Sequence, residues 1–349
     1  MAMLLLASIV LEDTRCSSAM VLFIFGDSLS DVGNNYYLTR SLARPALPWY
    51  GIDFGDGLPS GRFTNGRTIA DIVGEKMGLP RPPPFLDPSL DEDTIINQGV
   101  NYASGGGGIL NETGSIFIQR YSFWKQIELF KGTQEMIRRK IGKEAADKFF
   151  QQALYVVAMG SNDYINNFLL PFCSDSWNYD GDTFTNYLIT TLESQLRVLH
   201  SLGVRQMTFF GLGPLGCIPL QRFFNQSGQC QESTNKLALK FNSKSVNLLE
   251  NLSKTLPNVT FKFVDAYNSF YDLINRPKNY GFTNVTDPCC SIGNLRASLT
   301  CTPLSRLCKD RSKYVFWDAY HPTERANAFM AHSFLNIMGI DQKPTNETI

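Results

Sequence analysis

A serine, an aspartate and a histidine in this chain have the types and spacing that acyl-transfer chemistry needs. Ser28 closely follows the apolar run Val21–Phe25, so it should lie at the turn where a buried strand ends. Near the other end of the chain, Asp318 precedes His321 by three residues. A single loop turn can therefore bring the Asp318 carboxylate to the Nδ1 atom of the ring. A serine nucleophile, an imidazole base and an orienting acid together form a triad for attack on a carbonyl group.

The small number of histidines narrows the choice of base. The chain contains three, His200, His321 and His332. His200 falls between leucines in an expected helix, and His332 falls near the end of the last expected helix, so both suit structural roles. We expect Pro322 to begin that last helix, because proline is favoured in the first helical turn. His321 would then lie at the start of the helix and is the candidate base.

Two other strand ends carry groups that can stabilise an oxyanion. A run of four glycines follows the expected strand Gly99–Tyr102, and bare glycine backbone can offer N–H donors to a developing negative charge. Asn162 follows the expected strand Leu154–Met159, where its amide could donate as well, although the ordinary role of asparagine there is to form a turn. A phosphate loop is not indicated, because the chain has no Gly-Lys-Ser/Thr and no Gly-x-Gly-x-x-Gly that opens a helix.

Short apolar runs alternate with helical patterns along the chain. This alternation predicts βαβ units, and therefore a parallel sheet with helices on both faces. In such sheets ligands bind outside the carboxyl ends of the strands, which is where the polar and glycine-rich segments fall. The expected strands are Val21–Phe25, Gly99–Tyr102, Leu154–Met159, Gln206–Phe210 and Thr260–Val264; the expected helices are Thr68–Met77 (with Asn65 as candidate cap), Tyr121–Ile141, Thr183–Leu202 and Asn235–Leu256.

Composition excludes several classes of partner. The chain has 349 residues, is 43% hydrophobic and carries no formal net charge, so it has no basic field to gather nucleic acid. It contains three histidines and no Cys-x-x-Cys pair, so we expect neither a metal site nor a cofactor. No stretch is long enough to span a bilayer.

The ends of the chain and its sequons favour export. Residues 1–19 resemble a short secretion signal, although no Lys or Arg precedes the apolar part and a frayed helix is the alternative. We expect one domain over residues 20–340, followed by a tail over 341–349. Candidate glycosylation sites are the six Asn-X-Ser/Thr asparagines, Asn111, Asn225, Asn251, Asn258, Asn284 and Asn346.

The eight cysteines are typical of disulfides in an oxidising compartment. Cys217 and Cys230 flank one loop, and we expect them to pair. Four more crowd into a later loop; bonding adjacent cysteines is strained, which leaves two pairings open. Cys173 is left over if Cys16 is removed with the signal. The later four are Cys289, Cys290, Cys301 and Cys308.

Several blocks taken together resemble the plant GDSL esterase/lipase family, part of the SGNH hydrolases. The similarity runs from about residue 21 to about residue 332. Each block is short, but in this order they are specific. The blocks are Phe25–Asp31, Gly33–Asn35, Gly61–Arg67, Asn101–Gly105, Gly160–Asp163 and Asp318–Thr323.

The resemblance implies a three-layer α/β/α sandwich with a five-stranded parallel sheet, the SGNH or flavodoxin-like arrangement. It implies Ser28 as nucleophile, His321 as base and Asp318 as its orienting acid. It also implies an oxyanion hole made of the Ser28 N–H, a glycine N–H, for which we favour Gly106, and the Asn162 side chain. Asp27 belongs to the family motif, and we assign it a structural role in the turn. The expected protein is thus a secreted serine esterase of the cell wall or apoplast.

Other activities on the same scaffold remain open. An acyltransferase or a wall-polysaccharide deacetylase would use the same site, and a non-catalytic carbohydrate-binding protein could keep the scaffold. The substrate would be a small-molecule, lipid or polysaccharide ester. Polar groups mixed with aromatics in the loop 45–67 favour a small or medium acyl group over an insoluble triglyceride.

Overall fold

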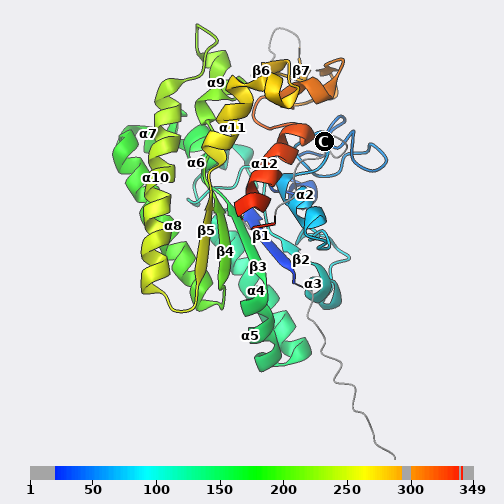
Figure 1. Ribbon diagram of the computed structural model, residues 1–349, viewed down its shortest axis with the longest axis vertical. Coiled ribbons are helices and arrows are strands. Elements are labelled where there is room, and N and C mark those ends of the chain that lie inside the picture. The colour runs from blue at the N-terminus through cyan, green and yellow to red at the C-terminus, as the bar shows by residue number, and fades with distance from the viewer. Residues whose placement is uncertain (1–19, 293–299, 338, 341–349) are drawn as a thin grey trace, which may run out of the picture.

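A five-stranded parallel sheet forms the centre of the computed structural model, which describes residues 20–292, 300–337 and 339–340. The strand order is β2-β1-β3-β4-β5, and neighbouring strands pair in parallel throughout. This is the flavodoxin-like order predicted by the resemblance, and each predicted strand is confirmed to within one residue at its ends. The strands are β1 (Leu22–Gly26), β2 (Gly99–Asn101), β3 (Leu154–Ala158), β4 (Gln206–Phe210) and β5 (Thr260–Val264) (Figure 1).

Side chains alternate between the two faces of this sheet, as the period of a strand requires. On β1, Phe23 and Phe25 enter the larger apolar core, while Leu22 and Ile24 enter a second core on the opposite face. The larger core is completed mainly by α4 (Phe123–Ile141), α5 (Lys143–Gln152), α8 (Gly181–Ser201), α10 (Glu232–Thr255) and α11 (Ala266–Asn275). The second is completed by α2 (Ile69–Lys76) and α12 (Glu324–Ile337), which lie side by side on the viewer's side of the sheet in Figure 1. The three-layer α/β/α prediction is therefore confirmed.

Side-chain caps determine where the predicted helices begin. Thr68, not Asn65, caps α2: its hydroxyl accepts from the Asp71 N–H, and Asp71 reciprocates at the Thr68 N–H. The Asn65 side chain instead accepts from the N–H of Glu324, the first residue of α12. The prediction that Pro322 begins this last helix is wrong, because Pro322 forms a β-bridge with Phe316 and the helix begins two residues later.

Several shorter elements were not predicted, because they are too short to show a clear period. They are α1 (Asn34–Tyr37), α3 (Glu92–Gln98), η1 (Ser115–Phe117), α6 (Ser161–Asp163), η2 (Tyr164–Phe168), α7 (Asp175–Asn178), η3 (Leu215–Cys217), α9 (Pro219–Phe224), η4 (Pro277–Tyr280), β6 (Asn284–Pro288), β7 (Cys290–Ser291), β8 (Arg306–Leu307), η6 (Arg311–Lys313) and β9 (Tyr314–Phe316).

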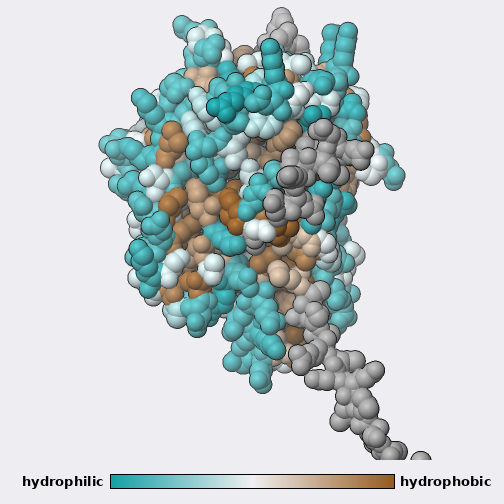
Figure 2. Space-filling view, viewed as in Figure 1, coloured by the Kyte–Doolittle hydropathy of each residue, from teal (hydrophilic) through white to brown (hydrophobic). Residues whose placement is uncertain are grey.

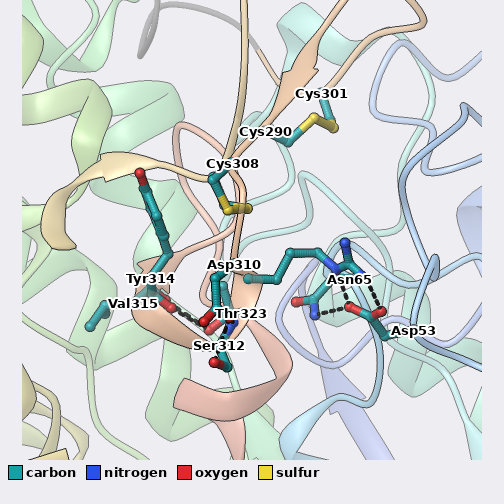
Figure 3. Close-up of a disulfide and its surroundings, with 12 residues drawn as sticks. Asp53, Asn65, Cys290, Cys301, Cys308, Asp310, Ser312, Tyr314, Val315 and Thr323 are labelled. Atoms are coloured by element: carbon teal, nitrogen blue, oxygen red, sulfur yellow. Dashed lines mark hydrogen bonds and ion pairs between the residues drawn. A yellow bond between two sulfur atoms is a disulfide. The ribbon is translucent and has the colours of Figure 1, made fainter. Parts of the chain in front are cut away.

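Disulfides hold two of these irregular regions. Cys217 at the end of η3 is bonded to Cys230. Two ways of pairing the four later cysteines were left open by the sequence. The structure adopts the one that joins Cys289 to Cys308 and Cys290 to Cys301. Figure 3 shows this cluster beside Asp53 and Asn65, which belong to a loop more than two hundred residues earlier in the chain.

Hydrophobic and hydrophilic residues separate on the visible surface. In Figure 2 hydrophobic residues gather near the middle of the view, over the sheet and α12, whereas hydrophilic residues cover the helices at its margins. None of the helices within the described ranges combines the length and the apolar character needed to cross a bilayer. The predicted secretion signal, the tail after residue 340 and Asn346 lie outside the described residues.

Gly99→Ala should destabilise the fold, because α3 runs directly into β2 at this residue. Gly99 has φ +78°, and a Cβ there would come within 2.0 Å of the Leu22 carbonyl oxygen. Gly203 provides a matched control, since it has φ +93° with no atom near its missing Cβ. We expect Gly203→Ala to cost about 1–2 kcal/mol of unfolding free energy for the backbone alone, and Gly99→Ala about 2 kcal/mol more for the clash. Urea unfolding of both variants would measure this, and equal losses would show that the close approach is unimportant.

Candidate active site

The two ends of the described chain meet at one hydrogen bond. Ser28 follows β1, and its Oγ lies 2.7 Å from the Nε2 atom of His321. On the other side of the ring, Nδ1 lies 2.8 Å from both carboxylate oxygens of Asp318. Asp318 is fully buried and His321 nearly so. The three predicted residues therefore lie within hydrogen-bond distance of one another, with the His321 ring between Ser28 and Asp318.

Neighbouring groups favour the ionised form of the Asp318 carboxyl group. Burial opposes ionisation, but the neighbouring His321 ring and hydrogen bonds from His321, from the Tyr50 hydroxyl and from the Tyr320 N–H lower its pKa below the usual value. Tyr50 donates to Asp318 Oδ2 over 2.7 Å. Tyr50 is itself 1% exposed, and its oxygen accepts from the Cys301 N–H at 3.2 Å. An ionised Asp318 can stabilise the imidazolium that forms when His321 takes a proton.

The disulfide cluster holds the loop that carries His321. The Cys290 N–H donates to the Trp317 carbonyl at 2.7 Å, and the Trp317 N–H donates to the His321 carbonyl at the same distance. Cys290 is bonded to Cys301, which also contacts Tyr50. The pairing that the structure adopts therefore links a disulfide to both sides of the Asp318–His321 pair.

The residues expected to form the oxyanion hole, Ser28, Gly106 and Asn162, line one cavity. Among the described residues, no protein acceptor takes the N–H of Ser28 or of Gly106. The N–H groups of Gly105 and Gly107, in contrast, are taken by Asp31 and by Ser104. Gly106 also lines the cavity beside Ser28, and its φ of +80° together with the nearby Phe117 ring leaves no room for a side chain. Its free N–H therefore suits the oxyanion role expected of it.

The Asn162 amide is fixed so that one donor remains available. Its Nδ2 donates to the Gly107 carbonyl at 2.9 Å, and its Oδ1 accepts from Asn166 Nδ2 at 2.6 Å. An amide nitrogen carries two hydrogens, so one remains for a ligand. Asn162 lines the same cavity as Ser28 and Gly106. The bond from Asn166 sets which end of the amide faces the site.

Buried carboxylates hold the loops that carry these donors. Asp31 accepts from the N–H groups of Gly33, Asn34, Asn35 and Gly105, which ties the loop after β1 to the glycine run. Asp163, next to Asn162, accepts from the N–H groups of Ile109 and Leu110 and from the Thr113 hydroxyl. Burial raises the pKa of both acids to about 6, although these donors lower it.

Asp27 has the turn role that the sequence suggested. Its Oδ1 accepts from the Leu29 N–H at 2.9 Å, which fixes the turn around Ser28. It is 2% exposed, and burial raises its pKa to about 7 despite the Leu29 hydrogen bond and the nearby His321. Asp27 therefore keeps its proton to a higher pH than an ordinary aspartate.

Sequence reasoning missed three residues of the site. Gln126 lies 100 residues from Gly26, yet its side chain accepts from the Gly26 N–H and donates to the Gly26 carbonyl, which braces the residue before the turn. Its signal was a polar residue on the buried stripe of α4. Asn166 follows Asn162 by one helical turn. Tyr50 gave no signal, because its partner lies 268 residues away.

Among the described residues, the predicted glycosylation sites and Cys173 have no contact with Ser28, Asp318 or His321. Asn111, Asn251 and Asn258 are exposed, whereas Asn225 and Asn284 are half-buried and their amide nitrogens donate to Gln229 and Asp287. Cys173 is a half-buried free thiol, and burial raises its pKa. Within residues 20–292 and 300–340, 338 excepted, no group of three or more His, Cys, Asp or Glu side chains is placed to hold a metal ion.

Comparison with known proteins identifies relatives over nearly the whole chain. A family model described as GDSL-like lipase/acylhydrolase matches residues 22–334. The chain is 61% identical to GDSL esterase/lipase At1g74460 of Arabidopsis thaliana over 324 residues, which are 93% of this chain and 88% of that protein. It is 49% identical to GDSL esterase/lipase At5g37690 of the same plant over 323 residues, 92% and 90% of the two chains.

Among solved structures, the chain is similar to LAE5, an α/β hydrolase enzyme from the metagenome of Lake Arreo, Spain. That likeness covers 93% of this chain and 98% of the other, with 12% identity and a TM-score of 0.43. It is too distant to carry an argument about the site.

Tyr50→Phe should weaken activity and move its dependence on pH. The variant removes one donor that lowers the pKa of Asp318, so that pKa should rise. Activity in acid should then be lost at a higher pH than in the wild type, and kcat/KM at neutral pH should fall by about tenfold, as expected for a hydrogen bond to a charged group. Tyr155→Phe is the control, because Tyr155 is equally buried and its hydroxyl donates to the Phe150 carbonyl, away from the triad. An unchanged acid limb in Tyr50→Phe would contradict a role in holding Asp318.

Asp27→Asn should become stabilising as the pH rises. The pKa of Asp27 is raised from 3.8 to about 7 in the folded state. Its favourable contribution to the free energy of unfolding is therefore fully present below pH 3.8 and is lost as the pH rises through 7. Asparagine keeps the acceptor for Leu29 and carries no charge. The unfolding free energy of the variant minus that of the wild type, measured by urea unfolding, should therefore increase by on the order of 1–4 kcal/mol between pH 4 and pH 8. A difference that stays constant over this range would show that Asp27 titrates normally.

Proposed function

Since the chain belongs to the GDSL-like lipase/acylhydrolase family and is thus a carboxylic ester hydrolase, we propose that it cleaves esters through Ser28, His321 and Asp318. The observation that carries this proposal is the 2.7 Å contact between Ser28 Oγ and His321 Nε2, two residues that line the same cavity. A serine hydroxyl is a weak nucleophile until a base takes its proton. His321 is within hydrogen-bond reach and is oriented for this task by Asp318.

Acylation would proceed in one addition and one elimination. Ser28 Oγ attacks the ester carbonyl carbon while its proton moves to His321 Nε2, and Asp318 stabilises the resulting imidazolium through Nδ1. The carbonyl π electrons move onto oxygen, which becomes the oxyanion. The C–O bond to the alcohol then breaks, and the alcohol leaves with the proton from His321. An acyl group remains bound to Ser28.

Deacylation repeats these steps with water. His321 takes a proton from a water molecule, the hydroxide oxygen adds to the acyl carbon, and Ser28 leaves with the proton returned by His321. An alcohol in place of water would give an acyltransferase with the same residues. Apart from the ester and the water or alcohol, these steps use only groups of this chain.

Stabilisation of the oxyanion is assigned to the Ser28 N–H, the Gly106 N–H and Asn162 Nδ2. All three belong to residues that line the cavity at Ser28, and each has a hydrogen that no protein acceptor takes among the described residues. Donors fixed in advance in a partly buried site are effective, because they need no reorganisation as the charge develops. The bonds from Asp31, Asp163 and Asn166 supply that rigidity.

Secretion to the cell wall space is part of the same proposal. Three disulfides support it, because such bonds are typical of oxidising compartments outside the cytosol. Exposed sequon asparagines, Asn111, Asn251 and Asn258, are available for glycosylation on that route. Mass spectrometry of the protein isolated from plant wall fluid, before and after removal of N-glycans, would test this part directly.

Ser28→Ala should abolish ester hydrolysis and labelling by a fluorophosphonate probe. Loss of a triad nucleophile costs several orders of magnitude in kcat, roughly 10⁶-fold in a well-studied serine protease. The control is Ser161→Ala, a serine that lines the same cavity without contacting His321 in the described structure. It should retain labelling and lose no more than about threefold in rate, well below the effect of a catalytic group. Turnover by Ser28→Ala above a tenth of the wild-type rate would contradict the assignment.

Asn162→Ala should lower kcat with little change in KM. A donor to the oxyanion acts in the transition state and not in the ground state, so its loss should cost roughly 100- to 1000-fold in kcat. Asn166→Ala is the paired variant: it leaves the Asn162 amide in place and removes only the bond that orients it, so it should cost less. Steady-state kinetics on a soluble acetate ester would separate the two constants. If KM changes and kcat does not, Asn162 binds substrate and does not stabilise the oxyanion.

A further inference from the structure

One arginine lines the cavity that contains Ser28. Among the described residues around this cavity, Arg44 is the only lysine or arginine. Asp27 is the one aspartate or glutamate of the same described lining, and it is almost fully buried, with its carboxylate accepting from the Leu29 N–H. This lining therefore presents a cation to a ligand and no exposed acid to oppose it.

The guanidinium of Arg44 has no carboxylate partner in the described part of the chain. Its Nη2 donates to the Tyr36 carbonyl at 3.1 Å, and no described acceptor takes the hydrogens of Nε or Nη1. Nε is enclosed by the protein, whereas Nη1 is not among the enclosed unpaired atoms and is therefore open to a ligand. Arg62, in contrast, donates from two nitrogens to Asp71, each at 2.7 Å.

An unpaired guanidinium of this kind is unusual in the framework of a fold. An arginine carries five N–H donors, and buried donors are nearly always hydrogen-bonded in native structures. One described hydrogen bond from Arg44 leaves most of its donors unused, including the enclosed Nε. The side chain therefore does not complete a hydrogen-bond network of the fold, and a role toward a ligand is the better account of its place in the cavity wall.

The main chain before Arg44 is fixed against the glycine run. Asn35 Nδ2 donates to the carbonyl oxygens of Ala43 and Gly105, each at 2.8 Å, so these two carbonyl groups are neighbours. Asn35 and Tyr36 are consecutive residues of α1. The same short helix therefore positions both the main chain before Arg44 and its guanidinium.

A second contact ties this segment to Gly106. The Leu42 N–H donates to the Phe117 carbonyl at 3.0 Å, and the Phe117 ring lies within 2.5 Å of where a Cβ on Gly106 would be. All three residues line the cavity together with Arg44. Arg44 thus belongs to the side of the cavity that carries Gly106, one of the donors assigned to the oxyanion.

We propose that Arg44 binds a carboxylate carried by the substrate, so that the preferred substrate has a free carboxylate in addition to the ester that is cleaved. This inference rests on the proposed function, since it places the ester carbonyl at Ser28. The planar guanidinium matches the geometry of a carboxylate and binds it through parallel N–H groups. Attraction between the two charges is stronger in a partly enclosed cavity than in bulk water.

The main test compares esters that differ only in charge. Methyl hydrogen adipate and its amide, methyl adipamate, place the carboxylate or its neutral counterpart on the acyl side. The acetates of γ-hydroxybutyrate and γ-hydroxybutyramide place it on the alcohol side. In at least one pair, the wild-type kcat/KM should be about tenfold or more higher for the charged ester, as expected for a hydrogen bond between charged groups. The pair that shows this preference identifies the side of the ester that faces the arginine, and a smaller ratio in both pairs would overturn the proposal.

Arg44→Gln should remove this preference, so that the charged-to-neutral ratio of kcat/KM falls to about one. Arg40→Gln is the matched control, because Arg40 is an exposed arginine four residues earlier that does not line the cavity, and the ratio should stay within twofold of the wild-type value. If Arg44 only supported the loop, its loss would lower the rates on both esters together and leave their ratio unchanged. That result would contradict the proposal.

Binding gives a readout that depends neither on turnover nor on the folding of an Arg44 variant. Isothermal titration of Ser28→Ala should give a Kd at least tenfold lower for the charged member of one pair than for its amide, and adding Arg44→Gln should remove the difference. This result would support the carboxylate site even if the wild type hydrolysed no ester, an outcome that would overturn only the proposed function. Equal Kd values for the acid and the amide in both pairs would refute the site.

Discussion

The hydrogen bond between Ser28 and His321 joins residues that lie 293 positions apart in the chain. It can form only if the first strand and the last loop reach the same edge of the sheet. The sheet order brings this about, because β1 lies inside the sheet and the segment before α12 returns over its carboxyl end. The disulfide pairs of the irregular region and the Thr64, Asn65 and Arg67 contacts to the start of α12 then hold that segment in place.

Buried carboxylates do the same for the other loops of the site. Asp31, Asp163 and Asp318 each accept several hydrogen bonds from backbone or side-chain donors, and each belongs to a different segment of the chain. A carboxylate offers about four acceptor positions, so one residue can organise a whole turn. The result is a rim in which Gly106, Asn162 and His321 are positioned by groups that never touch a substrate.

The strands and most residues of the site could be predicted, because short stretches of the sequence indicate them directly. The five strands are apolar runs with clear ends, and the blocks around Ser28, Asn162 and His321 are recognisable as they stand. Non-local features could not be predicted. Tyr50 is an ordinary loop tyrosine until Asp318 is placed beside it, and Gln126 becomes significant only when α4 packs behind Gly26. The choice between two disulfide pairings depends on packing that no window of sequence contains. The prediction that Pro322 begins the last helix was wrong, because Pro322 forms a β-bridge with Phe316 although proline is favoured at the start of helices.

The central claim is that one serine is activated and one oxyanion is stabilised at the rim where these loops converge. A crystal structure of the protein inactivated by a p-nitrophenyl alkylphosphonate tests it most directly. The account predicts a phosphorus bonded to Ser28 Oγ, with one phosphoryl oxygen about 2.7–3.1 Å from the Ser28 nitrogen, the Gly106 nitrogen and Asn162 Nδ2. A bond to another residue, or a phosphoryl oxygen that points away from these three donors, would contradict it.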